Sequence, residues 1–372
     1  MISEKRVLKK KFWFTEKEIE TYQQFFDCRL SDIRKRFLSN SAFTGLRPYL
    51  DNFSWHPVTH NKWYTANFYP NMGLKMAETY GFLHEVYGST VSGKNLCSAK
   101  DLDAFITERE LNQVVIKHVG GGVGSNLFII DQIDKTEKNF SYQTNTGKIL
   151  THNDLEAILK RVDGGLTGYL VEERLHLHPE VRKITGDGLS SLRFETLQYG
   201  RHVNKVQYAY IRLGLEGMAT DHSIRNGVYV PVDLDTGMMN KGLDTSRPIE
   251  DQWVSKHPLT GITFEGKTVP NWREFKEMAL KASISTPGLH RVGWDLFPSS
   301  NGPRLLEGNV GGGIVIDQLM FGGFFDNGVF DDWMRYLATP KPDGSFSWRF
   351  KHWNKGRRLK PFEQFVSSIL QD

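Results

Sequence analysis

Hydrophobic and polar positions along the chain follow two spacings, one typical of helices and one typical of strands. Thr15 and Glu18 form a capping-box pattern, and the apolar residues behind them recur every three to four positions, which predicts a helix over residues 16–38. The stretch 39–73 is rich in aromatic residues, Asn, Pro and His, and has no regular period. Helical spacing predicts further helices at residues 74–85, after Ser98, at 153–162 and, behind an N-cap at Asn271, at 272–283.

Short apolar runs bounded by Gly, Pro, Asn or Ser predict strands. Strands and helices occur in separate blocks of the sequence, without the strict alternation of a parallel α/β protein, so the pattern predicts an α+β fold. The expected strands are residues 114–117 and 127–130 on either side of a glycine loop, 168–173, a hairpin of 192–198 with 203–213, and a last hairpin of 292–297 with 304–306.

The length of 372 residues, with 39% hydrophobic and 24% charged residues, allows two or three globular units and excludes a fibre or a disordered chain. No internal repeat or low-complexity segment is present. We expect a mostly helical region at residues 1–108, a small α+β subdomain at 109–170, a large subdomain at 171–338 and a basic, aromatic tail at 339–372.

The formal charge of +4 and the pI of about 8.8 make the chain only slightly basic, so no nucleic-acid partner is expected. Basic side chains are interleaved with Phe and Trp over residues 341–360 of the tail. Such a mixture can touch an anionic membrane surface, or it can pack its rings on the domain and leave its charges in water.

No apolar run approaches the length of a membrane span, and the basic N-terminus has no apolar segment behind it, so we expect a cytoplasmic protein. Cys28 and Cys97 lie far apart without metal-type spacing, which fits a reducing compartment. The motif G-x-S-x-G is absent, and no pattern indicates a nucleophilic Ser or Cys.

The last hairpin carries the most specific candidate chemistry. If it turns about Asn301, Asp295 and Glu307 lie opposite each other, because each is six residues from the centre, and Asn309 shares their face. Two opposed carboxylates repel unless a cation lies between them, and oxygen ligands of this kind suit Mg²⁺ or Mn²⁺. The alternative is a solvated hairpin with its charges in water.

The glycine loop at residues 120–125 follows Lys117. It lacks the Lys-Ser/Thr ending of a P-loop and does not complete G-x-G-x-x-G. A turn without side chains can still fold over a triphosphate and donate backbone N–H groups, while Lys117 neutralises charge. A hairpin tip with a solvated lysine is the alternative.

Two further features carry charge next to apolar strands. Residues 170–175 end a strand with Glu172 and Glu173, which suits contacts with an adenine edge or ribose hydroxyls, or plain solvation. Arg193 and Arg212 lie inside apolar strands, and a buried guanidinium needs a carboxylate or phosphate partner. A structural ion pair would meet that need as well.

The order of these motifs resembles the ATP-grasp superfamily, and within it the alpha-L-glutamate-ligase-like branch associated with sugar transfer and polysaccharide gene clusters. The resemblance covers about residues 61–318. Its motifs are Asn61-Lys62-Trp63, Val115-Ile116-Lys117 with the glycine loop, the segments 192–197, 209–214, 232–237 and 257–261, Gly293-Trp294-Asp295, and Leu306-Glu307-Gly308-Asn309.

The resemblance implies a fold in which two α+β subdomains sandwich ATP, with Mg²⁺ or Mn²⁺ as the second cofactor. The metal ligands it implies are Asp295, Glu307 and Asn309. The nucleotide contacts it implies are Lys62, Lys117, Gly121, Gly122, Gly124 and Ser125 at the phosphates, and Glu172, Glu173 and Leu175 beside adenine. The catalytic residues it implies are Arg193, Arg212 and Asn309.

The activity implied by the resemblance is carboxylate–amine ligation. A carboxylate attacks the γ-phosphate of ATP, and an amine then displaces phosphate from the acyl-phosphate to leave an amide. Positioning and charge stabilisation carry such chemistry, so it needs no protein nucleophile. The substrates would be small or sugar-linked acids and amines of polysaccharide biosynthesis. A kinase that uses the same site and a non-catalytic nucleotide-binding scaffold of glycan assembly are the alternatives.

Overall fold

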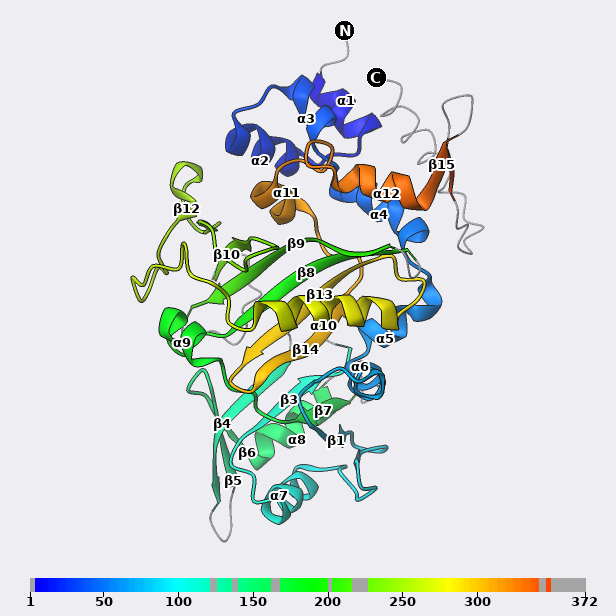
Figure 1. Ribbon diagram of the computed structural model, residues 1–372. Coiled ribbons are helices and arrows are strands. Elements are labelled where there is room, and N and C mark those ends of the chain that lie inside the picture. The colour runs from blue at the N-terminus through cyan, green and yellow to red at the C-terminus, as the bar shows by residue number, and fades with distance from the viewer. Residues whose placement is uncertain are drawn as a thin grey trace.

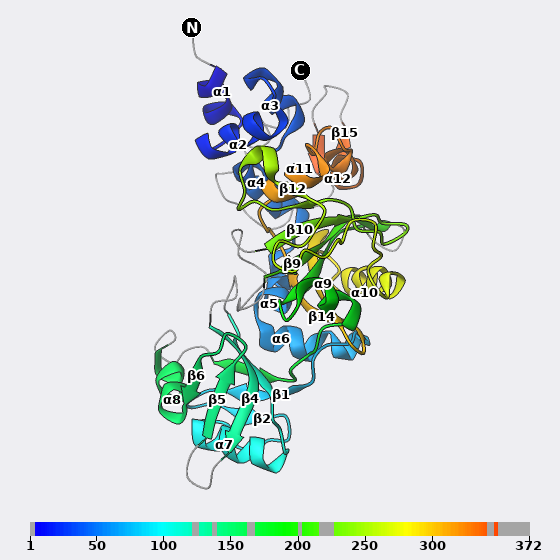
Figure 2. The same ribbon diagram turned by 90° about the vertical axis from the view of Figure 1, so that its left-hand side faces the viewer.

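The computed structural model describes residues 4–120, 126–135, 140–161, 168–199, 203–215, 227–340 and 346–348. Over these residues the chain forms two seven-stranded sheets, a two-stranded hairpin and a group of helices. The three large parts follow one another along the molecule, with the first sheet at one end, the second in the middle and helices at the other end (Figures 1 and 2). The structure confirms the expected α+β class.

The helices at the far end form what we call the helical cap. Its core is aromatic and includes Tyr22, Phe37, Phe324 and Trp333. The cap brings together segments from both ends of the chain: α1 (Glu4–Lys11), α2 (Glu16–Phe26), α3 (Leu30–Arg36), α4 (Asn40–Leu50), α11 (Val315–Phe321) and α12 (Val329–Leu337).

The helix predicted over residues 16–38 is divided in two. The capping box is present, because Thr15 accepts a hydrogen bond from the Glu18 N–H while the Glu18 carboxylate accepts one from the Thr15 N–H. However, Asp27 has a φ of 46°, a left-handed conformation that ends α2. The prediction of one continuous helix was therefore wrong.

The stretch without a regular period, residues 39–73, is mostly helical. After α4 it forms short turns that run beside the second sheet towards the first sheet (Figure 1). These are η1 (Phe53–Trp55), α5 (His56–His60), α6 (Lys62–Phe68) and η2 (Pro70–Met72).

The first sheet has the strand order β2-β1-β7-β3-β4-β5-β6. Helices α7 (Ala99–Glu108) and α8 (His152–Arg161) pack their apolar sides on it, and both follow the expected helices after Ser98 and at 153–162. The strands are β1 (Thr79–Leu83), β2 (Ser89–Thr90), β3 (Val114–His118), β4 (Leu127–Lys135), β5 (Phe140–Thr144), β6 (Ile149–Thr151) and β7 (Tyr169–Glu172).

Residues 74–85 were expected to form a helix, and this was wrong. Part of the stretch is strand β1, which pairs antiparallel with β7, so that Phe82 lies opposite Leu170. A partner almost ninety residues away decides the conformation, and local spacing cannot report it. The expected boundary at residue 108 consequently separates β1, β2 and α7 from the sheet to which they belong.

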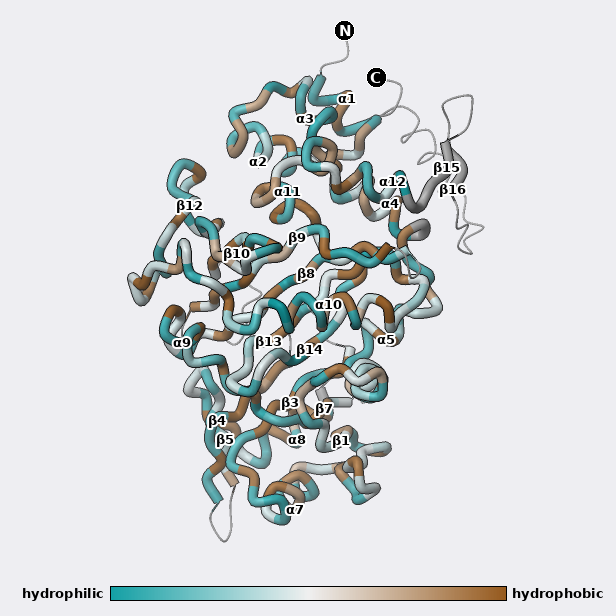
Figure 3. Tube along the Cα trace, viewed as in Figure 1, coloured by the Kyte–Doolittle hydropathy of each residue, from teal (hydrophilic) through white to brown (hydrophobic). Residues whose placement is uncertain are grey.

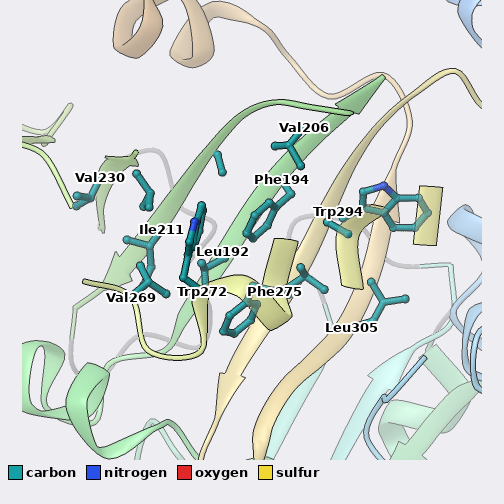
Figure 4. Close-up of a cluster of buried hydrophobic side chains, with 14 of the residues drawn as sticks. Leu192, Phe194, Val206, Ile211, Val230, Val269, Trp272, Phe275, Trp294 and Leu305 are labelled. Atoms are coloured by element: carbon teal, nitrogen blue, oxygen red, sulfur yellow. The ribbon is translucent and has the colours of Figure 1, made fainter. Parts of the chain in front are cut away.

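The second sheet has the order β12-β11-β10-β9-β8-β13-β14 and confirms both expected hairpins. One face is apolar and is covered by α10 (Trp272–Ser285), and Figure 4 shows Phe194, Trp272 and Phe275 in this layer. Helix α9 (Pro179–Thr185) lies between the two sheets in sequence. The strands are β8 (Ser190–Tyr199), β9 (Val203–Gly214), β10 (Gly227–Val232), β11 (Gly242–Leu243), β12 (Trp253–Val254), β13 (Arg291–Ser299) and β14 (Gly302–Asn309).

Asn271 stands at the N-cap position of α10, but its side chain does not cap the helix. Its φ is 57°, and its side-chain Nδ2 donates instead to the Glu274 carboxylate at 3.0 Å. The helix therefore begins where expected, whereas the expected cap was wrong.

The second sheet also has a polar face. Hydrophobic and hydrophilic residues are intermingled along β8, β9 and β13 in Figure 3, as expected where alternate side chains point to opposite sides. Of the expected tail, the structure describes only β15 (Ala338–Pro340) and β16 (Phe346–Trp348) as backbone, and residues 349–372 lie outside the described part. No helix in the described ranges is long and apolar enough to cross a membrane.

Candidate active site

The polar face of the second sheet gathers charged side chains from three neighbouring strands. Arg193 on β8 is paired in register with Asp295 on β13, and Glu195 is paired with Gly293. Because side chains at i and i+2 share a face of a strand, these residues lie on the side opposite α10. This alternation explains how such apolar strands carry buried charges.

The last hairpin has the predicted pairing but reaches it by a different route. Near the turn Ser299 pairs with Gly302, so the turn is centred between Ser300 and Asn301 and not on Asn301. A bulge that inserts Leu306 then shifts the register by one residue and brings Asp295 opposite Glu307. Without the bulge, Glu307 would point to the other face of the sheet.

Asp295 is the centre of the cluster and is 2% exposed. Its Oδ1 accepts hydrogen bonds from Arg193 Nε at 2.6 Å and lies 2.7 Å from Arg212 Nη2, while its Oδ2 accepts from Arg193 Nη2 at 3.0 Å. The pair with Arg193 is therefore bidentate, the strongest arrangement open to these groups. The structural ion pair that the sequence left open for both arginines is present.

Asn309 links the two carboxylates. Its Nδ2 donates to Asp295 Oδ2 at 2.8 Å and to Glu307 Oε1 at 3.3 Å. The three residues expected to share a face are thus in contact, and the Glu307 side chain keeps 24% of its surface exposed.

This donor set fits a hard dication. The NH₂ group of Asn309 now donates to both carboxylates. The oxygen of the same side-chain amide is a ligand of the kind that binds Mg²⁺. The described residues contain no cluster of three or more His, Cys, Asp or Glu side chains arranged for a metal, so the fit depends on Asn309 as the third ligand. The metal roles of Asp295, Glu307 and Asn309 stay predictions.

Lys62 connects the two sheets. It is the first residue of α6, and its backbone N–H donates to Val119 O at 2.9 Å, directly after β3. Its Nζ lies 3.5 Å from Glu307 Oε2 on the second sheet. Lys62 therefore stands between the first sheet and the carboxylates of the second, where a phosphate bound to both would lie.

Lys117 lies on the first sheet, paired with Glu172 at 2.6 Å, and both side chains are largely buried. The carboxylate of Glu173, the next residue, accepts the Glu78 N–H at 3.0 Å. The Leu175 carbonyl accepts a hydrogen bond from the Arg174 side chain at 2.5 Å. Glu172 therefore faces the expected phosphate lysine, while Glu173 bonds to the backbone of Glu78, just before β1, and Leu175 to the neighbouring Arg174.

The glycine loop cannot be compared with its prediction. Gly121, Gly122, Gly124 and Ser125 lie outside the described residues. Gly120, the first residue of the loop, is described and packs near the His118 ring.

Sequence reasoning missed the residues that extend the cluster towards the helical cap. Glu195, Arg291, Asp317 and Tyr208 are each at most 3% exposed and connect Arg193 to the cap. Burial, and then the charge of Glu195, raises the pKa of Asp317 to about 6. The signal that could have found Glu195 and Arg291 is the even spacing of charged residues along one strand face, two positions from Arg193 to Glu195 and four from Arg291 to Asp295.

Comparison with known proteins gives a family. The model of a family described as sugar-transfer associated ATP-grasp matches residues 45–326, more than half of the chain. No curated protein matches significantly.

Solved structures with a similar arrangement are distant in sequence. A biotin carboxylase complex from Campylobacter jejuni is 11% identical, with a TM-score of 0.45 over 81% of this chain and 51% of that one. The D-alanyl-alanine synthetase A of Vibrio cholerae O1 biovar eltor is 11% identical, with a TM-score of 0.42 over 86% and 67%. An L-amino acid ligase from Bacillus licheniformis is 11% identical, with a TM-score of 0.37 over 86% and 49%. The chain spans about half the length of the first solved structures that it matches.

Proposed function

The chain belongs to the sugar-transfer associated ATP-grasp family, and from this premise we propose that it is an ATP- and magnesium-dependent ligase that joins a carboxylate to an amine. The observation that carries the proposal is the contact of Lys62 with both sheets. Its backbone N–H donates to Val119 O directly after β3, and its ammonium lies 3.5 Å from Glu307 Oε2, so one cationic residue contacts both sheets.

In this proposal the first sheet binds the nucleotide. Lys117 leaves Glu172 to contact the phosphates, and Lys62 leaves Glu307 in the same way. The residues around 172–175 stand beside adenine. Both lysines exchange a carboxylate for a phosphate, so neither is desolvated without a partner in either state.

The second sheet carries the transfer. Asp295, Glu307 and Asn309 would hold Mg²⁺, which would neutralise charge on the phosphates. Arg193 and Arg212, held in place by Asp295, direct fixed positive charge at the oxygens of the transferred group. In this proposal the substrate carboxylate attacks ATP directly, and no covalent intermediate forms on the protein.

The family description favours sugar-linked substrates, and we propose an acid or amine of polysaccharide or sugar-conjugate biosynthesis. The test is ADP release from Mg-ATP with a panel of amino, dicarboxylic and uronic acids. Hydroxylamine serves as a general amine, since it converts an acyl-phosphate into a hydroxamate. Mass spectrometry then identifies the product.

We expect ADP release that depends on a carboxylate and yields a hydroxamate. Glu307→Gln should lower this release by at least about 100-fold. Asp244→Asn serves as the control, since Asp244 is a buried carboxylate that pairs with Arg247 away from the site. A phosphorylated hydroxyl compound as product would identify a kinase, and unchanged turnover in Glu307→Gln would overturn the metal site.

A further inference from the structure

Arg193 has a second carboxylate partner that the proposed chemistry does not use. Its Nε and Nη2 are taken by Asp295, and its Nη1 donates to Glu195 Oε1 at 3.4 Å. Glu195 is 2% exposed and lies two positions from Arg193 on the same strand face. Nη1 also lies near Gly312, three residues after Asn309, because a Cβ on Gly312 would be 3.6 Å from it.

Gly293 leaves room for this contact. It is paired with Glu195 across the strands, and a Cβ on it would lie 2.4 Å from Glu195 Oε1 and 2.8 Å from Arg193 Nη1. Real Cβ atoms do not approach other atoms so closely. The two side chains therefore meet over a position where only hydrogen fits.

The second carboxylate oxygen of Glu195, Oε2, is linked to the helical cap through Arg291 of β13. Arg291 Nη2 lies 3.0 Å from Glu195 Oε2 and 3.6 Å from Asp317 Oδ2 on α11. Tyr208 donates to the same Asp317 oxygen at 2.9 Å and accepts from Arg291 at 3.2 Å. Negative and positive groups thus alternate from the candidate site into the cap.

Arg291 is also enclosed by rings of the cap. Its guanidinium lies 4.7 Å from the centre of the Phe43 ring on α4 and 5.8 Å from that of Trp333 on α12. Such contacts stabilise a cation that has left water. Three cap helices therefore fix the position of one arginine, and that arginine fixes Glu195.

We infer that Glu195 is a positioning residue for Arg193 and that Arg291 and Asp317 transmit the docking of the helical cap to it. The inference rests on the proposed function, in which Arg193 acts on the transferred phosphoryl group. Glu195 holds Nη1, which would lie 3.6 Å from a Cβ on Gly312, while Asp295 holds the other edge of the guanidinium. The cap is then part of the active site without touching the substrate.

The test is a double-mutant cycle on ADP release, measured with Mg-ATP, hydroxylamine and the most active carboxylate of the panel. Glu195→Gln keeps the shape of the side chain and removes its charge. We expect its kcat to fall about 10- to 100-fold while the KM for ATP changes less than about threefold. In a protein that already carries Arg193→Lys, Glu195→Gln should lower kcat by less than about twofold, because its target is gone.

Asp317→Asn tests the cap end of the chain and substitutes for Glu195→Gln if that variant does not fold. It should lower kcat in the same direction by about 3- to 10-fold and lose this effect in the Arg193→Lys background. Asp244→Asn again reports the general effect of losing a buried carboxylate. Melting temperatures of all variants accompany the kinetics.

If Glu195→Gln and Asp317→Asn lower kcat by the same factor in the Arg193→Lys protein as in the wild type, the inference is overturned and the ligase proposal stays intact. A rise in the KM for ATP with kcat unchanged would also overturn it, because uniform nucleotide binding would then be affected. A wild-type protein that releases no ADP with any acid of the panel would overturn the proposed function and this inference together.

Discussion

The two large sheets have the same number of described strands but treat buried charge differently. Beyond its apolar layer under α7 and α8, the first sheet has one largely buried lysine–carboxylate pair, Lys117 with Glu172. The second sheet carries three buried arginines, Arg193, Arg212 and Arg291. They are in continuous contact with Glu195 and Asp295 of the same sheet and with Asp317 of the helical cap. Among the described residues, one sheet therefore has an isolated lysine–carboxylate pair, and the other has a continuous network of arginines and carboxylates.

The difference follows from what a buried ion needs. An isolated buried ion pair can exchange its carboxylate for a phosphate, because the lysine keeps an anionic partner in both states. A guanidinium held on two edges by fixed carboxylates cannot move, which suits a group that must be in place before charge develops. The difference agrees with the function proposed above, in which the first sheet binds the nucleotide and the second carries the transfer step.

The largest effect is expected from removing the centre of the second network. Asp295→Ala leaves Arg193 and Arg212 without their shared carboxylate and should lower the free energy of unfolding by about 3–5 kcal/mol. Denaturant unfolding measures it. Asp235→Ala, whose side chain is 95% exposed, is the control and should change stability by less than about 0.5 kcal/mol. Equal changes in the two variants would contradict a buried network.

In the described part of the chain, the buried carboxylate of Asp51 has no close bidentate arginine partner, so its removal should stabilise the protein at high pH. Burial raises the pKa of Asp51 to about 7, because Arg47 is 3.9 Å away and offsets burial only in part. Its contribution to stability is full below its ordinary pKa and is lost as the pH rises through about 7. Asp51→Asn should remove this loss, which is at most about 4 kcal/mol.

Unfolding of both proteins between about pH 5 and pH 8 tests the Asp51 prediction. Wild type should lose stability relative to Asp51→Asn as the pH rises. Parallel curves would show that Asp51 ionises normally in the folded protein.

The first sheet provides a smaller change that can be reversed. Lys117→Met leaves Glu172 buried without its cation and should cost about 2–3 kcal/mol. The double variant Lys117→Met, Glu172→Leu should recover most of that stability, since an apolar pair replaces the ionic one. Calorimetric titration should detect no Mg-ATP binding by either variant. Recovery of ATP binding in the double variant would contradict the role given to Lys117.

The smallest expected effect on stability comes from replacing one glycine in each sheet region by alanine. Gly293→Ala places a methyl group within 2.4 Å of Glu195 Oε1 and should destabilise the protein by about 1–2 kcal/mol. Gly120→Ala, where the nearest atom is 3.6 Å away, should change the melting temperature little. Equal shifts in melting temperature in both variants would mean that Glu195 and Arg193 can move to accommodate a methyl group on residue 293.

Several parts of the fold and site were predictable because they depend on local patterns. The two hairpins of the second sheet and helix α10 follow from strand alternation, turn residues and helical spacing. The opposition of Asp295 and Glu307 was predicted from a turn about Asn301, but the bulge at Leu306 produces it. Family motifs added ATP-grasp membership. The glycine loop and the division into subdomains remain predictions.

The sequence by itself determined which residue types share a strand face, because that property depends only on neighbours two positions apart. Tertiary structure decided what those faces meet. Lys62 reaches Glu307, and Arg291 reaches Asp317, only after distant segments have packed together. The bulge at Leu306 and the pairing of β1 with β7 likewise depend on partners outside any local window. Contacts of this kind are selected by packing and burial of the whole chain, which local spacing does not encode.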